Sequence, residues 1–517
     1  MRTKHSLINI SVGIGNQLVI TLLSFFSRTV FIHTLGVEYL GLNGLFTNIL
    51  AMLSLAEAGI GSSIVYTLYK PVADNNKEKI LVLMRLYKKA YLIIALIVLL
   101  LGLSLLPFLQ YIVKDANVEH IYVIYLVFLL NTVTPYLFQH KISYLNVCQK
   151  NYIVTGIYSV SSILSMFLKI GILYWTQNYI LYLIIDSVIT ITNSLIMSLI
   201  VNRMYPFLKE KGIGSLDNDT KSNIIKNVKA IVLQNIGSYL IFGTENIIIS
   251  TYVSIAAVGL YSNYKMLIDI CRTLINQVFN NMYHSVGNLV ASESKDKVYS
   301  VYKVTMLLNF WLYSFAAIAM YVMIEPFIKL WIGEKFLMGN LIVIILMVTF
   351  YERGMRNSIT TVKTTAGIFH EDRYIPLIQA AVSLVFSLVL VQKIGISGVF
   401  IGTLISAIAV PFWTTPFFVY RKVFDKPLHH YFMRYLYYTV IGFGTCAATS
   451  FIGSFISADT TWMLVMKAAV CVIVPNAIYV ALFYKTEEFQ YVFGIVLQLL
   501  RSLQRKLRRV PSPDVSS

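Results

Sequence analysis

The sequence predicts an all-α polytopic membrane protein with about 14 transmembrane helices, and three observations lead to this fold class. Of the 517 residues, 57% are hydrophobic and only 13% are charged, whereas a typical soluble chain is ~25% charged. Apolar segments long enough to cross a bilayer recur from residue 8 to residue 484, with no long polar insertion between them. Lysine and arginine gather in alternate loops between these segments. One membrane domain therefore fills the chain.

Each expected span holds about 20 mostly apolar residues, the length that crosses the hydrocarbon core. The expected limits are 8–34, 43–68, 88–112, 120–140, 153–175, 179–203, 228–252, 256–282, 301–328, 340–362, 375–394, 397–420, 431–457 and 462–484. The first span is too long for the apolar core of a signal peptide, and no small-residue cleavage site follows it. We therefore expect this helix to remain in the mature protein.

The net charge of +18 predicts an orientation in the membrane rather than binding to nucleic acid. The basic residues lie in short loops and do not form one continuous face. The loops expected outside hold only Lys114, Lys329, Lys335 and Lys393, and the other loops hold the remaining basic clusters. Because loops rich in Lys and Arg stay inside, we expect both termini in the cytoplasm.

An internal repeat predicts two related halves. The segment YLGLNGLF at 39–46 aligns with AVGLYSNY at 257–264, an offset of 218 residues. This offset places the first helix on the seventh and the second on the eighth, so both halves begin on the same side of the membrane. A parallel repeat of this kind has two six-helix lobes, related by an axis along the membrane normal, with the substrate site between them.

Four parts of the chain follow from this repeat. They are an N-lobe at 1–212 (helices 1–6), a C-lobe at 213–428 (helices 7–12), two additional helices at 429–485 and a basic amphipathic tail at 486–517. The tail joins an apolar stretch to the basic stretch RSLQRKLRR, as expected of a helix that lies along an anionic inner leaflet. We interpret the tail as a membrane anchor rather than a partner-binding segment.

The cysteines and histidines do not predict a metal site. Cys148, Cys271, Cys446 and Cys471 are scattered, without the paired spacing of a metal or redox site. The histidines show no ligand spacing either. We interpret the four cysteines as packing residues.

Two stretches resemble a known family. The similarity covers RTVFIHTLGVEYLGLNGLFTNILAMLSLAEAGIGSSIVYTLYKP at 28–71 and GTENIIISTYVSIAAVGLYSNY at 243–264. These stretches resemble bacterial polysaccharide-repeat-unit (Wzx-type) flippases of the multidrug/oligosaccharidyl-lipid/polysaccharide (MOP) exporter superfamily. Members with fourteen helices include the lipid II flippases, which carry an arginine in helix 1 where Arg28 stands here.

The resemblance implies a flippase, not an enzyme, that serves surface polysaccharide assembly. Such a protein moves an undecaprenyl-pyrophosphate-linked oligosaccharide from the inner to the outer leaflet by alternating access. The implied structure is a V-shaped pair of six-helix lobes in the bacterial cytoplasmic (inner) membrane. The implied partners are the lipid bilayer, the polyprenyl-pyrophosphate-linked glycan, and a polysaccharide polymerase with its chain-length machinery.

Charged side chains inside the spans indicate a polar interior. An ionisable residue in a span costs at least ~2.5–3.5 kcal/mol, so it normally faces a cavity, a partner or an interface. In the first helix, Gln17, Thr21, Ser24 and Arg28 stand at i, i+4, i+7 and i+11, on one helix face. We expect this face to line the interior, and the alternative is that Arg28 snorkels to the outer interface.

Two further helices carry similar faces. They hold Lys265, Asp269, Arg272 and Asn276 in helix 8, and Arg353, Arg356, Thr360 and Lys363 in helix 10. Guanidinium N–H groups suit the oxygens of a pyrophosphate, and aromatic faces such as those of Tyr239 and Tyr264 suit sugars. The predicted substrate-binding residues are Arg28, Arg272, Arg353, Arg356, Lys265, Ser24, Gln17 and Tyr264.

The remaining charges within the spans are expected to have protein partners. Glu245 maps by the repeat offset to position 27, so it lies at nearly the depth of Arg28. We expect Glu245 and Arg28 to act as a gate, an ion pair that closes the outer side. Lys169 is expected to snorkel or to form a structural pair, and Asp186 to pair within its lobe.

The source of energy is expected to be an ion gradient, the membrane potential or consumption of product outside, and no cofactor is expected. The sequence contains no GxxxxGK[ST] motif, which argues against ATP hydrolysis by this chain. Moving one negative charge outward across an inside-negative potential yields ~2.3 kcal/mol per 100 mV. Glu57, in the middle of the second helix, is the candidate site for H⁺ or Na⁺ coupling, and the alternative is a carboxylate paired within its lobe.

Two other function classes are alternatives. A multidrug/cation antiporter of the same superfamily needs an acidic and aromatic site, whereas the interior faces here are mainly basic. A membrane polysaccharide polymerase or ligase needs reactive residues at an outer-leaflet site, and the outer loops are about a dozen residues or shorter by the expected helix limits. Both alternatives are therefore less favoured than the flippase.

Overall fold

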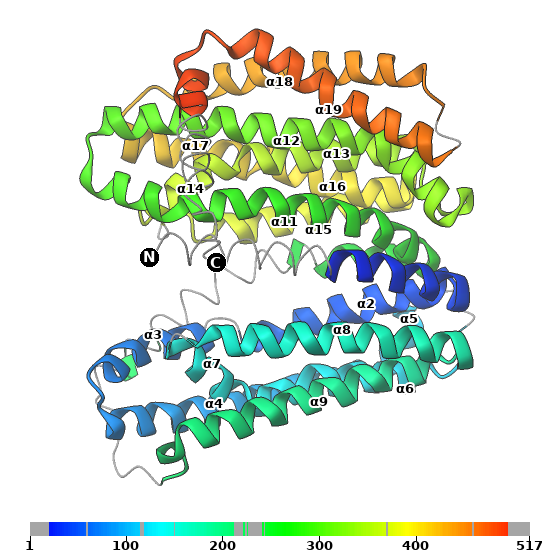
Figure 1. Ribbon diagram of the computed structural model, residues 1–517, viewed down its shortest axis with the longest axis vertical. Coiled ribbons are helices and arrows are strands. Elements are labelled where there is room, and N and C mark those ends of the chain that lie inside the picture. The colour runs from blue at the N-terminus through cyan, green and yellow to red at the C-terminus, as the bar shows by residue number, and fades with distance from the viewer. Residues whose placement is uncertain are drawn as a thin grey trace, which may run out of the picture. The chain divides into compact units, whose positions relative to one another are not determined.

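The structure is a computed structural model that describes residues 20–57, 60–113, 118–148, 150–210, 221–222, 225, 240–241, 243–368, 371–457 and 460–494. Gln17, Tyr239 and the basic end of the tail lie outside these ranges. Every regular element within the ranges is a helix (Figure 1). The all-α class predicted from the sequence is therefore confirmed.

The helices also match the expected spans. Among the described residues, eight helices are long and apolar enough to cross a membrane, or nine if the bent pair Ile121–Leu137 and Gln139–Val147 forms one span. The helices Ile20–Leu35 and Val37–Leu53 are apolar but shorter. Each of the expected spans coincides with a helical segment in the described ranges, because hydropathy over about 20 residues is a local property of the chain.

The chain forms two compact units, and unit 1 comprises Met1–Asn263 and Pro376–Thr403. Its elements are the helix Ile20–Leu35, α2 (Val37–Leu53), α3 (Ile60–Ala73), α4 (Lys77–Ser104), α5 (Leu109–Ile112), α6 (Ile121–Val133), α7 (Gln139–Val147), α8 (Asn151–Thr176), α9 (Tyr179–Met204), the start of α11 (Ile255–Ser292), most of α15 (Ile375–Ile394) and the first part of α16 (Ile396–Ala409). Its largest fully buried side chains are aromatic and include Phe46, Tyr87, Tyr91 and Tyr125.

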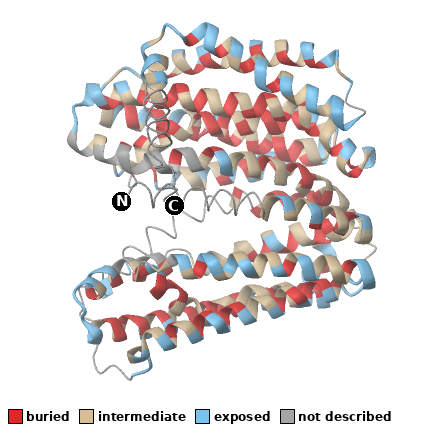
Figure 2. Cartoon of the chain, in the orientation of Figure 1, coloured by how far each residue is buried: buried red, intermediate tan, exposed pale blue. Residues whose placement is uncertain are grey.

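Unit 2 comprises Tyr264–Ile375 and Leu404–Ser517. It holds the rest of α11 and α16, together with α12 (Lys295–Ile332), α13 (Asn340–Met355), α14 (Asn357–Thr365), α17 (Pro411–Val419), α18 (His429–Ser454) and α19 (Thr461–Phe483). Helix α12 is the centre of this unit. In its most apolar stretch of 18 residues 61% of the residues are buried, against 17% in the corresponding stretch of α19 (Figure 2). The expected lobe boundary between 212 and 213 lies outside the described residues, and the predicted domains stay a prediction.

Helices α11 and α12 are longer than the spans expected for them. Each has 38 residues, which is ~57 Å at the helical rise and exceeds the ~30 Å of the hydrocarbon core. Both helices therefore extend beyond the membrane near the turn that joins them at 293–294. Hydropathy could not predict these extensions, because they are polar.

Two glycines related by the repeat form a close helix crossing in unit 1. A Cβ on Gly41 of α2 would lie 2.1 Å from the carbonyl oxygen of Ile255, and one on Gly259 of α11 would lie 2.2 Å from the carbonyl oxygen of Val37. Gly41 and Gly259 differ by the same 218 residues as Val37 and Ile255. The contact is therefore reciprocal, as a two-fold repeat predicts, and only glycine lets the backbones approach this closely.

Several of the expected spans are broken helices, and two of the breaks lie next to charged residues singled out in the sequence. Between α2 and α3 lies the 3₁₀ turn Ser54–Glu57, and the Ser54 hydroxyl donates to the Leu50 carbonyl at 2.9 Å, a bond that bends helices. The span expected at 43–68 is thus not one continuous helix, and Glu57 lies at its break.

The second break separates α13 from α14 at Arg356. Asn309 Nδ2 of α12 donates to the Gly354 carbonyl at 2.6 Å, and the Tyr313 ring occupies the space that a Cβ on Gly354 would need. A side chain that takes a helical carbonyl in this way disturbs the hydrogen-bond ladder.

Candidate functional site

Arg28 is held within unit 1 by neutral side chains of α11. Its Nε donates to Asn263 Oδ1 at 2.8 Å, and its Nη2 donates to Ser262 Oγ at 2.6 Å. Asn263 is completely buried, and the arginine is half-buried. These two partners satisfy N–H groups but bring no negative charge to the guanidinium.

Glu245 is bound to the same part of α11. The Tyr261 hydroxyl donates to its carboxylate at 3.3 Å, and the Thr403 hydroxyl donates at 2.9 Å. Three successive residues of α11, Tyr261, Ser262 and Asn263, thus bind both members of the expected gate. A direct ion pair between Arg28 and Glu245 stays a prediction.

The basic face expected in the span 256–282, which lies in α11, is a local ion cluster. Asp269 lies 3.0 Å from Lys265 Nζ and 3.0 Å from Arg272 Nη1. The three side chains are about one-third exposed or slightly more. One carboxylate therefore offsets part of the charge of the two cations that we predicted to bind substrate.

Arg356 has a close carboxylate partner that the sequence analysis missed. Its Nε and Nη2 donate to the two carboxylate oxygens of Glu352, at 2.5 and 3.0 Å. The side chains of Arg356 and Glu352 are only 13% and 5% exposed. The spacing i, i+4 was a signal for this pair. Arg353, next to Glu352, is half-buried on the same helix.

Glu57 belongs to a polar network inside unit 1. The Tyr91 hydroxyl of α4 donates to its carboxylate. The rings of Tyr91 and Tyr87 pack edge to face at 4.9 Å, and the Tyr87 hydroxyl donates to Ser143 at 2.8 Å. This network is compatible with either role expected of Glu57, ion coupling or pairing within its lobe.

The other predicted substrate residues have local partners. Tyr264 is completely buried, and its hydroxyl accepts a hydrogen bond from the Met338 amide at 2.9 Å. A sugar would reach this ring only after the surrounding residues move. The Ser24 hydroxyl donates to the carbonyl of Ile20 in its own helix at 2.8 Å. Gln17 lies outside the described residues.

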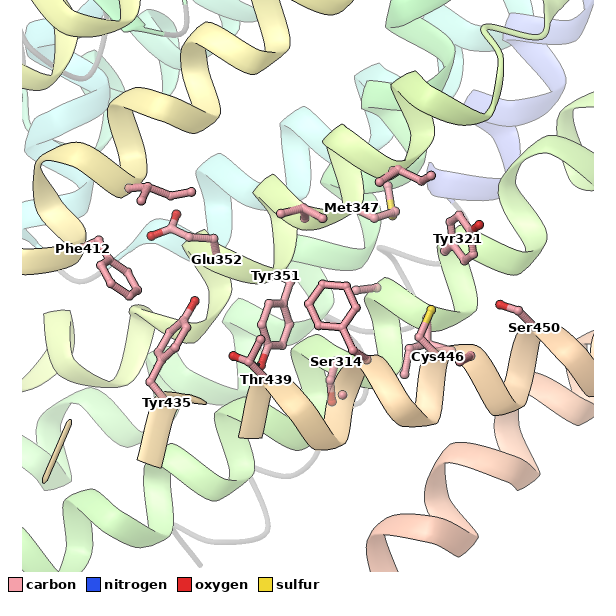
Figure 3. Close-up of a pocket in the computed structure, with 18 residues that line it drawn as sticks. Ser314, Tyr321, Met347, Tyr351, Glu352, Phe412, Tyr435, Thr439, Cys446 and Ser450 are labelled. Atoms are coloured by element: carbon pink, nitrogen blue, oxygen red, sulfur yellow. Dashed lines mark hydrogen bonds between the residues drawn. The ribbon is translucent and has the colours of Figure 1, made fainter. Parts of the chain in front are cut away.

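A cavity of about 520 Å³ lies within unit 2, between α12, α13, α18 and the segment from α16 to α17. Figure 3 shows Glu352, Phe412 and Tyr435 toward one end and Tyr321 and Ser450 toward the other. Most of its lining is apolar or aromatic. None of the substrate residues predicted from the sequence and described in the structure lines it.

Lys169 and Asp186 form an ion pair in unit 1. They lie on α8 and α9, which are joined by residues 177–178. From the sequence, Asp186 was expected to pair within its lobe, and Lys169 either to snorkel or to form a structural pair; the two residues pair with each other. The contact of Lys169 with the Tyr182 ring, whose centroid lies 4.5 Å from Lys169 Nζ, was not predicted.

No protein-family model matches this chain, and no curated protein matches it in sequence. Solved structures do match it. A structure of the lipid II flippase MurJ in an inward closed conformation has a TM-score of 0.67 at 14% identity, with 92% of this chain and 99% of that chain covered.

Multidrug transporters match as well. A mutant of the Vibrio cholerae MATE transporter VcmN has a TM-score of 0.56 at 17% identity, with 80% of this chain and 95% of that chain covered. An inward-facing MATE family transporter of the MOP superfamily has a TM-score of 0.53 at 14% identity, with 75% and 91% covered. This chain therefore shares its fold with flippases and drug transporters.

Proposed function

We propose that the protein is a flippase for undecaprenyl-pyrophosphate-linked oligosaccharide repeat units in the bacterial cytoplasmic membrane. It moves them from the inner to the outer leaflet by alternating access. The observation that carries this proposal is the guanidinium of Arg28, fixed to α11 by the neutral side chains of Asn263 and Ser262. A pyrophosphate offers negative charge and paired oxygen acceptors, which suit the N–H groups of a guanidinium.

The fold supports a transporter or flippase but does not identify the substrate, because it is shared with a lipid II flippase and with MATE transporters. The proposed substrate class is inferred from the charge of the predicted site. Arg28, Lys265, Arg272 and Arg353 give the predicted substrate residues a basic character, which suits an anionic headgroup. The polyprenyl tail needs no polar site, since it can remain in lipid while the headgroup crosses.

A multidrug/cation antiporter is the second candidate, because the cavity in unit 2 is aromatic and has a carboxylate in its wall. A lipophilic cation suits aromatic faces and a carboxylate. However, both carboxylate oxygens of Glu352 already accept bonds from Arg356. A cation at this place would have to displace a guanidinium, and this favours the flippase.

A polymerase or ligase is less favoured on the lengths of the connections. Residues 177–178 join α8 to α9, and Gly395 alone joins α15 to α16. Both connections lie on the expected outer side and leave little room for a catalytic loop. We infer that energy comes from the membrane potential or from H⁺ or Na⁺ bound at Glu57.

The proposal is tested by deleting the gene in its host and measuring lipid-linked intermediates by mass spectrometry. We expect undecaprenyl-pyrophosphate-linked oligosaccharide to accumulate on the inner leaflet, and the purified protein to flip that lipid in proteoliposomes. A deletion strain with normal lipid-linked intermediates but increased sensitivity to cationic drugs would favour the antiporter instead.

A further inference from the structure

The ion pair between Lys169 and Asp186 lies at the same depth of unit 1 as Arg28. Arg28 is seven residues before the end of its helix at Leu35, Lys169 is seven residues before the end of α8, and Asp186 is seven residues after the start of α9. Seven residues correspond to ~10 Å along a helix. Edge-to-face contacts of Phe31 with Tyr179 (5.6 Å) and Tyr182 (5.2 Å) show that these helix ends lie together.

The Tyr182 ring contacts both Lys169 and the helix that carries Arg28. Lys169 Nζ lies 4.5 Å from the centroid of the Tyr182 ring. The same ring stacks on Tyr179 and contacts Phe31, which stands at i+3 from Arg28 and so on the same side of its helix. One aromatic side chain thus connects a lysine of α8 with the helix that carries Arg28.

The partner of Lys169 is accessible. The side chain of Asp186 is 34% exposed, whereas that of Lys169 is 15% exposed. Apart from the lysine, Asp186 accepts a long hydrogen bond of 3.2 Å from Ser165. Charged groups inside a membrane span are costly. Because the carboxylate of Asp186 is partly exposed, another anion can approach the pair and replace Asp186 as the partner of Lys169.

We propose that Lys169 is a second cation of the Arg28 site and binds a phosphate of the substrate after leaving Asp186. This inference rests on the proposed flippase function and adds one binding residue to it. Arg28 offers a planar fork and Lys169 a mobile ammonium, so the two together suit an anion with two phosphates. Asp186 holds Lys169 in place while the site is empty.

The test is the affinity of the purified protein in nanodiscs for farnesyl pyrophosphate, a short isoprenyl pyrophosphate, measured with thermal stability on the same samples. Lys169→Met should weaken binding about tenfold, the worth of one charge-assisted hydrogen bond. Asp186→Asn should strengthen binding about threefold, because Lys169 is then released. Both variants should lower the melting temperature, since both break the pair.

Opposite changes in affinity separate this role from a structural one. If the pair only holds α8 to α9, both variants lose stability and neither strengthens binding, which overturns the proposal. Lys422→Met is the matched control, because it breaks an ion pair with Glu371 in unit 2, and we expect its affinity to be unchanged. If Lys169→Met does not fold, the double variant K169M/D186N removes both charges together and should bind as weakly.

The proposed function and this inference fail in different ways. A wild-type protein that does not bind farnesyl pyrophosphate overturns both. If the wild type binds, Arg28→Ala abolishes binding and Lys169→Met binds like the wild type, the flippase proposal stands and the role of Lys169 is wrong.

Discussion

Arg28 donates a 2.8 Å hydrogen bond to Asn263, and Asn263 is the last residue of unit 1 on α11. The next residue of that helix, Tyr264, belongs to unit 2. The guanidinium that we propose to bind substrate is therefore hydrogen-bonded at the point where the chain passes from unit 1 to unit 2. We expect a ligand that takes Arg28 from Asn263 to change a contact at this passage, and such a change would couple binding to rearrangement of the helix.

Replacement of Arg28 should separate the need for its charge from the need for its shape. Arg28→Ala should abolish flipping of the lipid-linked oligosaccharide in proteoliposomes, because no cation remains on this helix face. Arg28→Lys should retain part of the activity, since it keeps the charge but loses the planar fork. Normal flipping by Arg28→Ala would show that Arg28 is only an anchor at the outer interface.

Glu245→Gln should shift the protein toward an outward-open state if Glu245 closes the outer side. The charge that opposes Arg28 is lost, while an amide can still accept hydrogen bonds from Tyr261 and Thr403. Cysteine labelling at Leu35 and Val253, in a background without the native cysteines, measures the shift. Thr403→Val is the control, because it removes the hydrogen bond from Thr403 to Glu245 and leaves the charge of Glu245. Unchanged labelling of Glu245→Gln at both positions rules out the gate.

The sequence could predict the spans and the charged faces, but not the partners of those charges. Spans and faces are local patterns of about 20 residues. The contact of Arg28 with Asn263 joins residues 235 positions apart, and only packing determines it. Glu352 is different, because its i, i+4 spacing from Arg356 was visible in the sequence. The break after Gly354 depends on Asn309 of another helix, which no local pattern contains.

The pair Glu352 and Arg356 leads to a prediction about stability as well as binding. Arg356→Met should lower the free energy of unfolding by about 3–5 kcal/mol, because it leaves Glu352 buried without its counter-charge. The double variant E352Q/R356M should recover most of this loss. Chemical denaturation of the purified protein measures both.

Neutralising Arg353 together with Arg356 tests whether the two arginines bind substrate. We predict that neutralising Arg353 and Arg356 weakens affinity for a pyrophosphate lipid more than replacing Tyr264 does. Each variant is assayed in a background that carries Glu352→Gln, so that the buried carboxylate does not affect folding. Unchanged affinity in the stable variants removes both arginines from the site.

Glu57→Gln tests ion coupling. If Glu57 binds H⁺ or Na⁺, the variant should transport independently of that gradient or fail to complete the cycle, because an amide does not take up a proton or balance a cation. Proteoliposomes with imposed H⁺ or Na⁺ gradients give the measurement. Tyr91→Phe is the matched control, since it removes the hydrogen bond to Glu57 and keeps the carboxylate. Full gradient-dependent transport by Glu57→Gln would make Glu57 structural.

The crossing of α2 and α11 should be sensitive to a single methyl group at either of two positions. Gly41→Ala and Gly259→Ala each place a Cβ within 2.2 Å of a carbonyl oxygen of the facing helix, so the helices must separate. Overpacking of this kind costs about 1–3 kcal/mol, and we expect similar losses because the two contacts are related by the repeat. The double variant should lose less stability than the sum of the two single variants, since either methyl group already separates the same pair of helices.

Gly444→Ala in α18 is the control, because nothing lies within 4 Å of its Cβ. Alanine there should be neutral or should stabilise the helix by up to about 1 kcal/mol. Melting temperatures of the purified variants decide the matter: equal values for Gly41→Ala and Gly444→Ala would contradict the close crossing.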